Sequence, residues 1–153
     1  MMRVYKGLFI IIFCAFTLCS AFGATAEEVK QNIIEQAKTM GVEPAIVLSI
    51  AKTESGFRQE AKSAGGHVGV FQLSPATANN MGYNPYDLDE NIKAGITYYK
   101  NMYNMFGSME LAVAAYNSGP VAIKRHNNTI PVHSKHFVNK IMADYRVYKN
   151  AGL

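Results

Sequence analysis

Cysteine is nearly absent from this sequence of 153 residues, because Cys14 and Cys19 are its only thiols and both lie near the start. If the first 26 residues are removed, the remaining chain has no cysteine, which excludes disulfides, thiol catalysis and cysteine-bound metals for it. Charged residues are also few, at 17%, whereas 49% are hydrophobic. Such a chain can bury a core, and its length suits one domain. Its net charge of only +4 leads us to expect no nucleic acid among its partners.

A hydrophobic run of transmembrane length is missing as well. The apolar run at residues 8–19 would span about 18 Å as a helix, and a hydrocarbon core is about 30 Å thick. Arg3 and Lys6 precede this run, and a small-residue stretch ending in Ala24-Thr25-Ala26 follows it. This order is typical of a secretory signal peptide. We therefore expect a signal peptide at 1–26 and an exported domain at 27–153, located in the periplasm, in the cell envelope or outside the cell. If the leader stays uncleaved, it is the one segment expected to contact a membrane.

Sustained alternation of polar and apolar residues is also absent, so we expect at most a short β-hairpin within residues 63–73. Apolar residues recur instead at helical spacing, and proline, serine and glycine mark the helix ends. The prediction is a single, mainly α-helical domain with a structured loop at 57–73. Its helices are expected near residues 29–40, 44–56, 75–82, 92–106, 109–118 and 137–148.

Glu54 interrupts the apolar pattern of the second predicted helix. It lies seven residues after Val47 and four after Ile50, so it shares their buried face. Burial and the negative end of the helix dipole both disfavour a carboxylate, which raises its pKa. A raised pKa suits a general acid that works near neutral pH. The alternative is a helix that ends early and leaves Glu54 in water.

Other candidate sites are weaker. The glycine-rich residues 65–69 lack the G-K-[ST] ending of a phosphate-binding loop. His126, His133 and His136 have no cysteine to complete a metal site, so we expect no metal. No serine shows the sequence context of a nucleophile elbow. Tyr116 and Asn117, at the end of a predicted helix, are well placed to reach a cleft.

Four ordered motifs together resemble the catalytic domain of family 1 lytic transglycosylases, the goose-lysozyme-like enzymes that cleave bacterial peptidoglycan. Residues 54–57 (ESGF) resemble the family's E-S-x-[FW], and residues 61–72 (AKSAGGHVGVFQ) resemble its S-x-x-G-A-x-G-L-M-Q. Residues 91–99 resemble N-I-x-x-G-x-x-Y-L, and residues 115–120 (AYNSGP) resemble A-Y-N-A-G-P. The resemblance extends from about residue 30 to 145 and implies a lysozyme-like, goose-type fold.

The resemblance also implies roles for particular residues. Glu54 matches the single catalytic acid and base, and Ser63 matches the serine that orients this carboxylate. Gln72 matches the glutamine lining the sugar groove, Tyr116 matches the tyrosine close to the carboxylate, and Asn117 is its neighbour in the same motif. The implied substrate is a peptidoglycan glycan strand, with no cofactor required.

Two departures from the family pattern affect the cleft. His67 stands where the family usually has alanine, which adds a titratable side chain near the site. Residues 133–138 (HSKHFV) replace the family's E-T-x-x-Y-V, so contacts with glycan and stem peptide are expected to differ. These departures leave the catalytic acid in place.

Two other functions remain open from the sequence. A hydrolytic muramidase on the same fold would need a second acid, such as Asp87 or Asp89, to activate water. A non-catalytic peptidoglycan-binding or assembly protein of a secretion or conjugation system would hold glycan without cutting it. Residues 120–153 carry a net charge of +5, which suits an anionic envelope polymer or simply a solvated helix face. Targeting could come from an envelope machinery partner.

Overall fold

The computed structural model describes residues 23–153, so most of the predicted signal peptide lies outside the described residues. Within this part of the chain the structure is helical, and its only β-pairing is a pair of isolated bridges in the loop after α2. The prediction of a mainly helical domain with at most a short hairpin is therefore confirmed. The elements are α1 (Ala26–Thr39), α2 (Pro44–Glu54), α3 (Pro75–Asn80), α4 (Leu88–Phe106), α5 (Met109–Ser118), α6 (Pro120–Arg125), a 3-10 turn η1 (Val132–Ser134) and α7 (Lys135–Asn150).

The helix boundaries follow local chemistry that can be read from the sequence. Pro44 occupies the first turn of α2, where its missing N–H is not needed. The Ser74 hydroxyl caps α3 by accepting from the Thr77 N–H at 3.0 Å. Gly107 ends α4 with a φ of 64°, a left-handed conformation that glycine adopts without strain. These features set the ends of the helices that flank the candidate site.

The sequence prediction was wrong about the segment after α5. The sequence predicted that Ser118-Gly119-Pro120 ends a helix and gave no further helix before residue 137, yet Pro120 begins α6. Proline at the first helical position needs no N–H partner, and Gly119, with a φ of 80°, lets the chain turn between the two helices. The Gly-Pro pair thus ends one helix and starts another.

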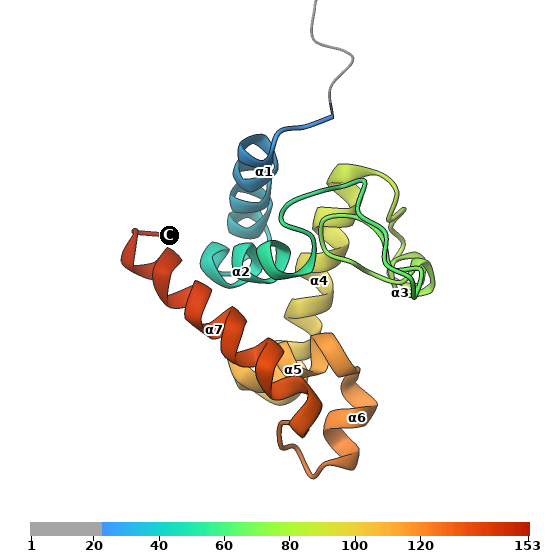
Figure 1. Ribbon diagram of the computed structural model, residues 1–153, viewed down its shortest axis with the longest axis vertical. Helices are drawn as coiled ribbons and strands as arrows, with labels where there is room; N and C mark the ends of the chain where they lie inside the picture. Colours follow the sequence, from blue (N-terminus) through green and yellow to red (C-terminus); the bar gives the residue numbers. More distant parts are fainter. Residues whose placement is uncertain (1–22) are drawn as a thin grey trace, which may run out of the picture.

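The core is arranged around α2 and α4. α2 is buried along its length and packs most extensively against α7, while α4 packs against α5. Figure 1 shows α7 running diagonally beside α2, and the loop between α2 and α3 lying on the other side of α2. The carboxyl end of α2 is therefore held between a long helix and a loop, which fixes the position of its last residue, Glu54.

The first helix begins inside the predicted signal peptide. α1 starts at Ala26, and Thr25 caps it by accepting from the Glu28 N–H at 3.2 Å, while the Thr25 N–H donates to the Glu28 carboxylate at 2.8 Å. This reciprocal capping box makes Thr25 part of the folded domain. None of the helices within residues 23–153 combines the length and the apolar character that crossing a membrane requires.

Candidate active site

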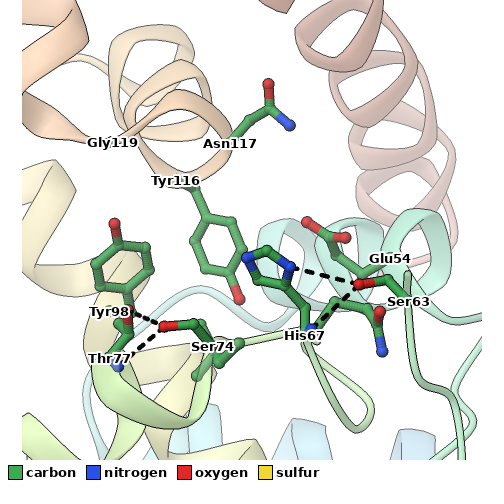
Figure 2. Close-up of a pocket in the computed structure, with 11 residues that line it drawn as sticks. Glu54, Ser63, His67, Ser74, Thr77, Tyr98, Tyr116, Asn117 and Gly119 are labelled. Carbon is green, nitrogen blue, oxygen red and sulfur yellow. Dashed lines mark hydrogen bonds between the residues drawn. The ribbon is translucent and has the colours of Figure 1, made fainter. Parts of the chain in front are cut away.

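A cleft of about 370 Å³ opens where α2, the following loop, α3, α4 and α5 meet. All five candidate residues from the sequence line it, together with side chains from the neighbouring helices (Figure 2). The lining residues are Glu54, Ser63, His67, Gln72, Leu73, Ser74, Thr77, Tyr98, Tyr116, Asn117 and Gly119. Residues from segments far apart in the chain thus share one concave surface.

Glu54 is partly buried at the last position of α2, on the wall of the cleft. Burial raises its pKa to about 7, and the positive charge of Lys140 on α7 opposes this increase without cancelling it. A carboxyl group with this pKa exchanges its proton near neutral pH, so it can act first as an acid and then as a base. Among residues 23–153, no side chain forms a hydrogen bond or an ion pair with Glu54, so its carboxyl group is free to meet a substrate.

Ser55 fixes the end of α2 to the loop that follows it, which also lines the cleft. Its buried hydroxyl donates to the Val70 carbonyl oxygen at 2.7 Å and accepts from the Arg58 N–H at 3.1 Å. The serine of the ESGF motif therefore holds the loop beside Glu54, and its side chain does not face the cleft lining.

Asn91 holds the same loop from the side of α4. Its fully buried side-chain amide accepts from the Phe71 N–H at 2.9 Å and donates to the Val68 and Pro85 carbonyl oxygens at 3.1 and 2.9 Å. Gly95, one turn further along α4, has no side chain because the Phe71 ring occupies that space. The asparagine and glycine of the third motif thus hold in place the loop that lines the cleft.

Ser63 and His67 face each other across a tight turn in this loop. The Ser63 hydroxyl accepts from the His67 backbone N–H at 3.1 Å and lies 3.4 Å from the imidazole Nδ1. Its side-chain bonds therefore go to His67, and within residues 23–153 none reaches Glu54. Figure 2 shows both residues on the same side of the cleft as the Glu54 carboxylate.

Gln72 closes the loop at the base of the cleft. Its side-chain Nε2 donates to the Ala61 and Gly69 carbonyl oxygens at 3.0 and 2.9 Å, which fixes the amide plane. Its backbone has a φ of 44°, an uncommon left-handed conformation for a residue with a side chain. Such strain is typical of positions held by a functional constraint.

Tyr116 forms the buried back wall of the cleft. Its ring packs edge-on against Tyr98 with centroids 5.1 Å apart, and its hydroxyl donates to the Phe71 carbonyl oxygen at 2.8 Å. Burial, and then the nearby charge of Glu54, raise the Tyr116 pKa well above its usual range. Asn117, the next residue, is exposed, and its Oδ1 accepts from the Ser134 hydroxyl at 3.3 Å, so its NH₂ group stays available to a ligand.

Sequence reasoning did not identify Thr77 and Tyr98 as lining residues, or Lys140 as the cation that acts on Glu54. Thr77 follows the second motif along the chain but carried no expected role, and Lys140 lies outside the motifs, so tertiary packing brings it to the site. Tyr98 lies within the third motif, and its position next to the core-facing Tyr99 was the sequence signal that could have identified it as a cleft residue.

The acids that a hydrolase could use lie elsewhere. Asp87 caps α4 by accepting from the Glu90 N–H at 2.9 Å, and Asp89 accepts from the Asn32 side-chain amide at 2.6 Å. Neither lines the cleft, where Glu54 is the one carboxylate contributed by residues 23–153. In the same part of the chain no three His, Cys, Asp or Glu side chains gather in a way that could hold a metal ion.

Comparison with known proteins identifies relatives of most of the helical region. The sequence pattern of the Transglycosylase SLT domain matches residues 31–137. A transglycosylase of Enterobacteria phage PRD1 is 33% identical over 79 residues, which are 51% of this chain and 30% of the phage protein. Membrane-bound lytic murein transglycosylase C of Haemophilus influenzae is 31% identical over 113 residues, covering 61% of this chain and 32% of that protein.

The fold is also known from solved structures. An inactive variant of lytic transglycosylase Slt from Pseudomonas aeruginosa superposes with a TM-score of 0.70 at 23% identity, covering 80% of this chain and 24% of that protein. This similarity confirms the predicted lysozyme-like helical fold. The chain spans about a third of the length of the curated relatives it matches.

Proposed function

This chain belongs to the family of Transglycosylase SLT domains, and we propose that it is a lytic transglycosylase that cleaves peptidoglycan glycan strands. The observation that carries the proposal is the solitary carboxyl group in the cleft. Burial brings the pKa of Glu54 to about 7, and no second acid of the described chain lines the same surface. A reaction that needs one group to act as acid and then as base fits this arrangement.

In the first step protonated Glu54 donates its proton to the oxygen that joins N-acetylmuramic acid to N-acetylglucosamine. The bond between this oxygen and C1 of the muramic sugar breaks, and positive charge develops at C1 as in an oxocarbenium ion. The N-acetylglucosamine side leaves with a free hydroxyl. Glu54 is now a carboxylate, and the nearby charge of Lys140 favours that ionised form.

In the second step the Glu54 carboxylate takes the proton of the muramic C6 hydroxyl. The C6 oxygen attacks C1, which closes a 1,6-anhydro ring and restores protonated Glu54. No water is consumed, so a second carboxylate that activates water is not needed. The reaction also needs no metal or cofactor.

The other lining residues are proposed to bind the sugars around this bond. Gln72 would offer its Oε1 to a sugar hydroxyl or N–H, because its Nε2 is already engaged within the loop. Asn117 would donate its NH₂ to the glycan, and Ser63 would contact both Glu54 and the acetamido group. Tyr116 would support the loop and shield the proton transfer from water.

Export and partners are part of the same proposal. A signal peptide at the start of the chain would carry the domain to the periplasm or cell envelope, where peptidoglycan lies. An envelope machinery partner would then restrict where the wall is opened. Lys124 and Arg125 of α6 and Lys135 of α7 are exposed and would make such an anionic or protein contact.

The test is to digest purified sacculi with the wild type and Glu54→Gln, and to identify the released muropeptides by mass spectrometry. The matched control is Glu60→Gln, an exposed carboxylate of the same loop that does not line the cleft. The proposal expects 1,6-anhydro products from the wild type and the control, and none from Glu54→Gln. Reducing ends from the wild type would indicate a hydrolase, and sacculus binding without any products would indicate a binding protein.

A further inference from the structure

Ser63 and His67 form a small, well-defined unit on the cleft wall. The Ser63 N–H donates to the His67 carbonyl oxygen at 3.0 Å, and the His67 N–H donates to the Ser63 hydroxyl at 3.1 Å. The hydroxyl also lies 3.4 Å from the imidazole Nδ1. Gly65 packs beneath the ring, because a Cβ at this position would approach Nδ1 to 3.3 Å. The imidazole is therefore seated beside the serine by the turn itself.

The protonation of the imidazole decides where the Ser63 proton points. A serine hydroxyl has one proton to donate and two lone pairs that accept. One lone pair already receives the His67 backbone N–H. When Nδ1 carries no proton, the Ser63 hydroxyl donates to it. When the imidazole is positively charged, Nδ1–H occupies the second lone pair, and the Ser63 proton must point elsewhere.

We propose that His67 is a positioning residue of the transglycosylase reaction, which directs the Ser63 hydroxyl proton into the cleft when its imidazole is positively charged. This inference rests on the proposed function of the cleft and adds a control to it. In the directed state Ser63 donates to the Glu54 carboxyl group or to a substrate carbonyl oxygen. In the neutral state with Nδ1 unprotonated, the same hydroxyl is turned away toward the ring.

Other titratable groups share the cleft with the imidazole. Glu54 faces the cleft from α2, Tyr98 from α4 and Tyr116 from α5, and Lys140 of α7 acts on Glu54. Both tyrosines have raised pKa values because they are buried, so they remain neutral near pH 7. Lys140 is thus the cation that stabilises the Glu54 carboxylate left after the first proton transfer, and His67 acts on the reaction through Ser63.

The active state therefore carries two protons, one on Glu54 and one on His67. Histidine is the side chain whose ordinary charge change falls near neutral pH. Above neutral pH the wild-type rate should therefore fall more steeply than the loss of a single proton would cause. A variant without the imidazole should depend on the Glu54 proton alone.

The experiment compares kcat between pH 6 and 9 for the wild type, His67→Ala and His67→Gln on purified glycan strands. We expect the rate ratio of each variant to the wild type to rise with pH and then level off, by about tenfold in all, which is the effect of one hydrogen bond. His67→Gln keeps size and polarity without a titrating group, so it should behave as His67→Ala does. His126→Ala, a histidine outside the cleft, should keep the wild-type pH dependence. A ratio that is constant with pH for the His67 variants would overturn the proposal.

A second measurement does not depend on activity. The ¹⁵N chemical shifts of the His67 ring are followed by NMR through a pH titration in the wild type and in Ser63→Ala. We expect the Nδ1 shift of the neutral ring to change in Ser63→Ala, because the hydroxyl that bonds Nδ1 is gone. Identical titration curves would refute the Ser63–His67 coupling. A wild type that cleaves no glycan but shows the expected NMR change would refute the proposed function alone.

Discussion

The Tyr116 hydroxyl donates a hydrogen bond of 2.8 Å to the Phe71 carbonyl oxygen, and this contact joins α5 to the loop that carries Gln72. The contact connects two motifs that are 45 residues apart in the sequence. Because burial and Glu54 keep the tyrosine neutral, its proton stays on this bond near pH 7. Tyr116 is thus a fixed wall of the cleft, and Glu54 is left as the group that exchanges protons.

Replacing Tyr116 with phenylalanine should loosen this wall. The buried Phe71 carbonyl oxygen would lose its partner, which costs about 1–2 kcal/mol of the free energy of unfolding. Urea denaturation of Tyr116→Phe measures this loss. Tyr103→Phe is the matched control, because Tyr103 is 44% exposed and should change stability little. Equal stability of the two variants would contradict a supporting role for the Tyr116 hydroxyl.

Glu54→Gln should stabilise the fold at alkaline pH. Burial raises the Glu54 pKa to about 7 in the folded state, so an ionised Glu54 is disfavoured there relative to the unfolded chain. Below about pH 4 the group is protonated in both states and has no effect. The wild type should therefore lose stability between about pH 4.5 and 7, by about 3 kcal/mol at most.

The measurement for this prediction is the free energy of unfolding at pH 4 and pH 8 for both proteins. Glu54→Gln should match the wild type at pH 4 and exceed it at pH 8. Glu60→Gln, an exposed carboxylate, should follow the wild type at both values. A Glu54→Gln variant that is no more stable at pH 8 would show that Glu54 is well solvated.

Gly95→Ala should destabilise the protein although alanine is the better helix former. The new methyl group would overlap the Phe71 ring, and overpacking of this kind costs about 1–3 kcal/mol. Phe71→Ala in the same chain removes Cγ and Cδ1, the two atoms nearest to the new methyl group, so the double variant is expected to be more stable than the sum of the single effects predicts. Denaturation of all three variants measures this coupling. Strictly additive effects would show that the glycine is not required by the ring.

If the proposed signal peptide is cleaved, the mature amino terminus should include Thr25. Cleavage after Ala26 would remove the capping box of α1, which is worth about 1 kcal/mol. We therefore expect a cut that leaves Thr25 in the exported protein, upstream of the boundary read from the A-x-A pattern. Intact-mass analysis of the exported protein locates the cut. A mature chain beginning at Glu27 would contradict this expectation.

Local signals explain why so much of the fold could be predicted from sequence. The helix ends at Pro44, Ser74 and Gly107 each depend on the chemistry of one or two neighbouring residues. The position of Glu54 on a buried helix face followed from spacing alone, and the structure places it at the end of α2. Short α6 was missed because a Gly-Pro pair ends and starts helices equally well.

Contacts between distant segments could not be predicted in this way. The bond between Ser63 and His67 requires the turn over Gly65, and the effect of Lys140 on Glu54 requires α7 to lie against α2. The motif residues Asn91 and Gly95 were recognised by resemblance, but their role in holding the Phe71 loop emerged only from packing. Spacing therefore identified Glu54 and the family resemblance identified Ser63 and Gln72, but neither identified their partners.

The most direct test of non-hydrolytic cleavage is digestion of sacculi in water labelled with oxygen-18, followed by mass spectrometry of the new muramic ends. If the C6 hydroxyl is the nucleophile, the products lack the label and are lighter by one water than reducing ends. This is the result we expect for the wild type, with no new ends from Glu54→Gln. New muramic ends that carry oxygen-18 at C1 would mean that water attacks the sugar, and would contradict the single-carboxylate mechanism.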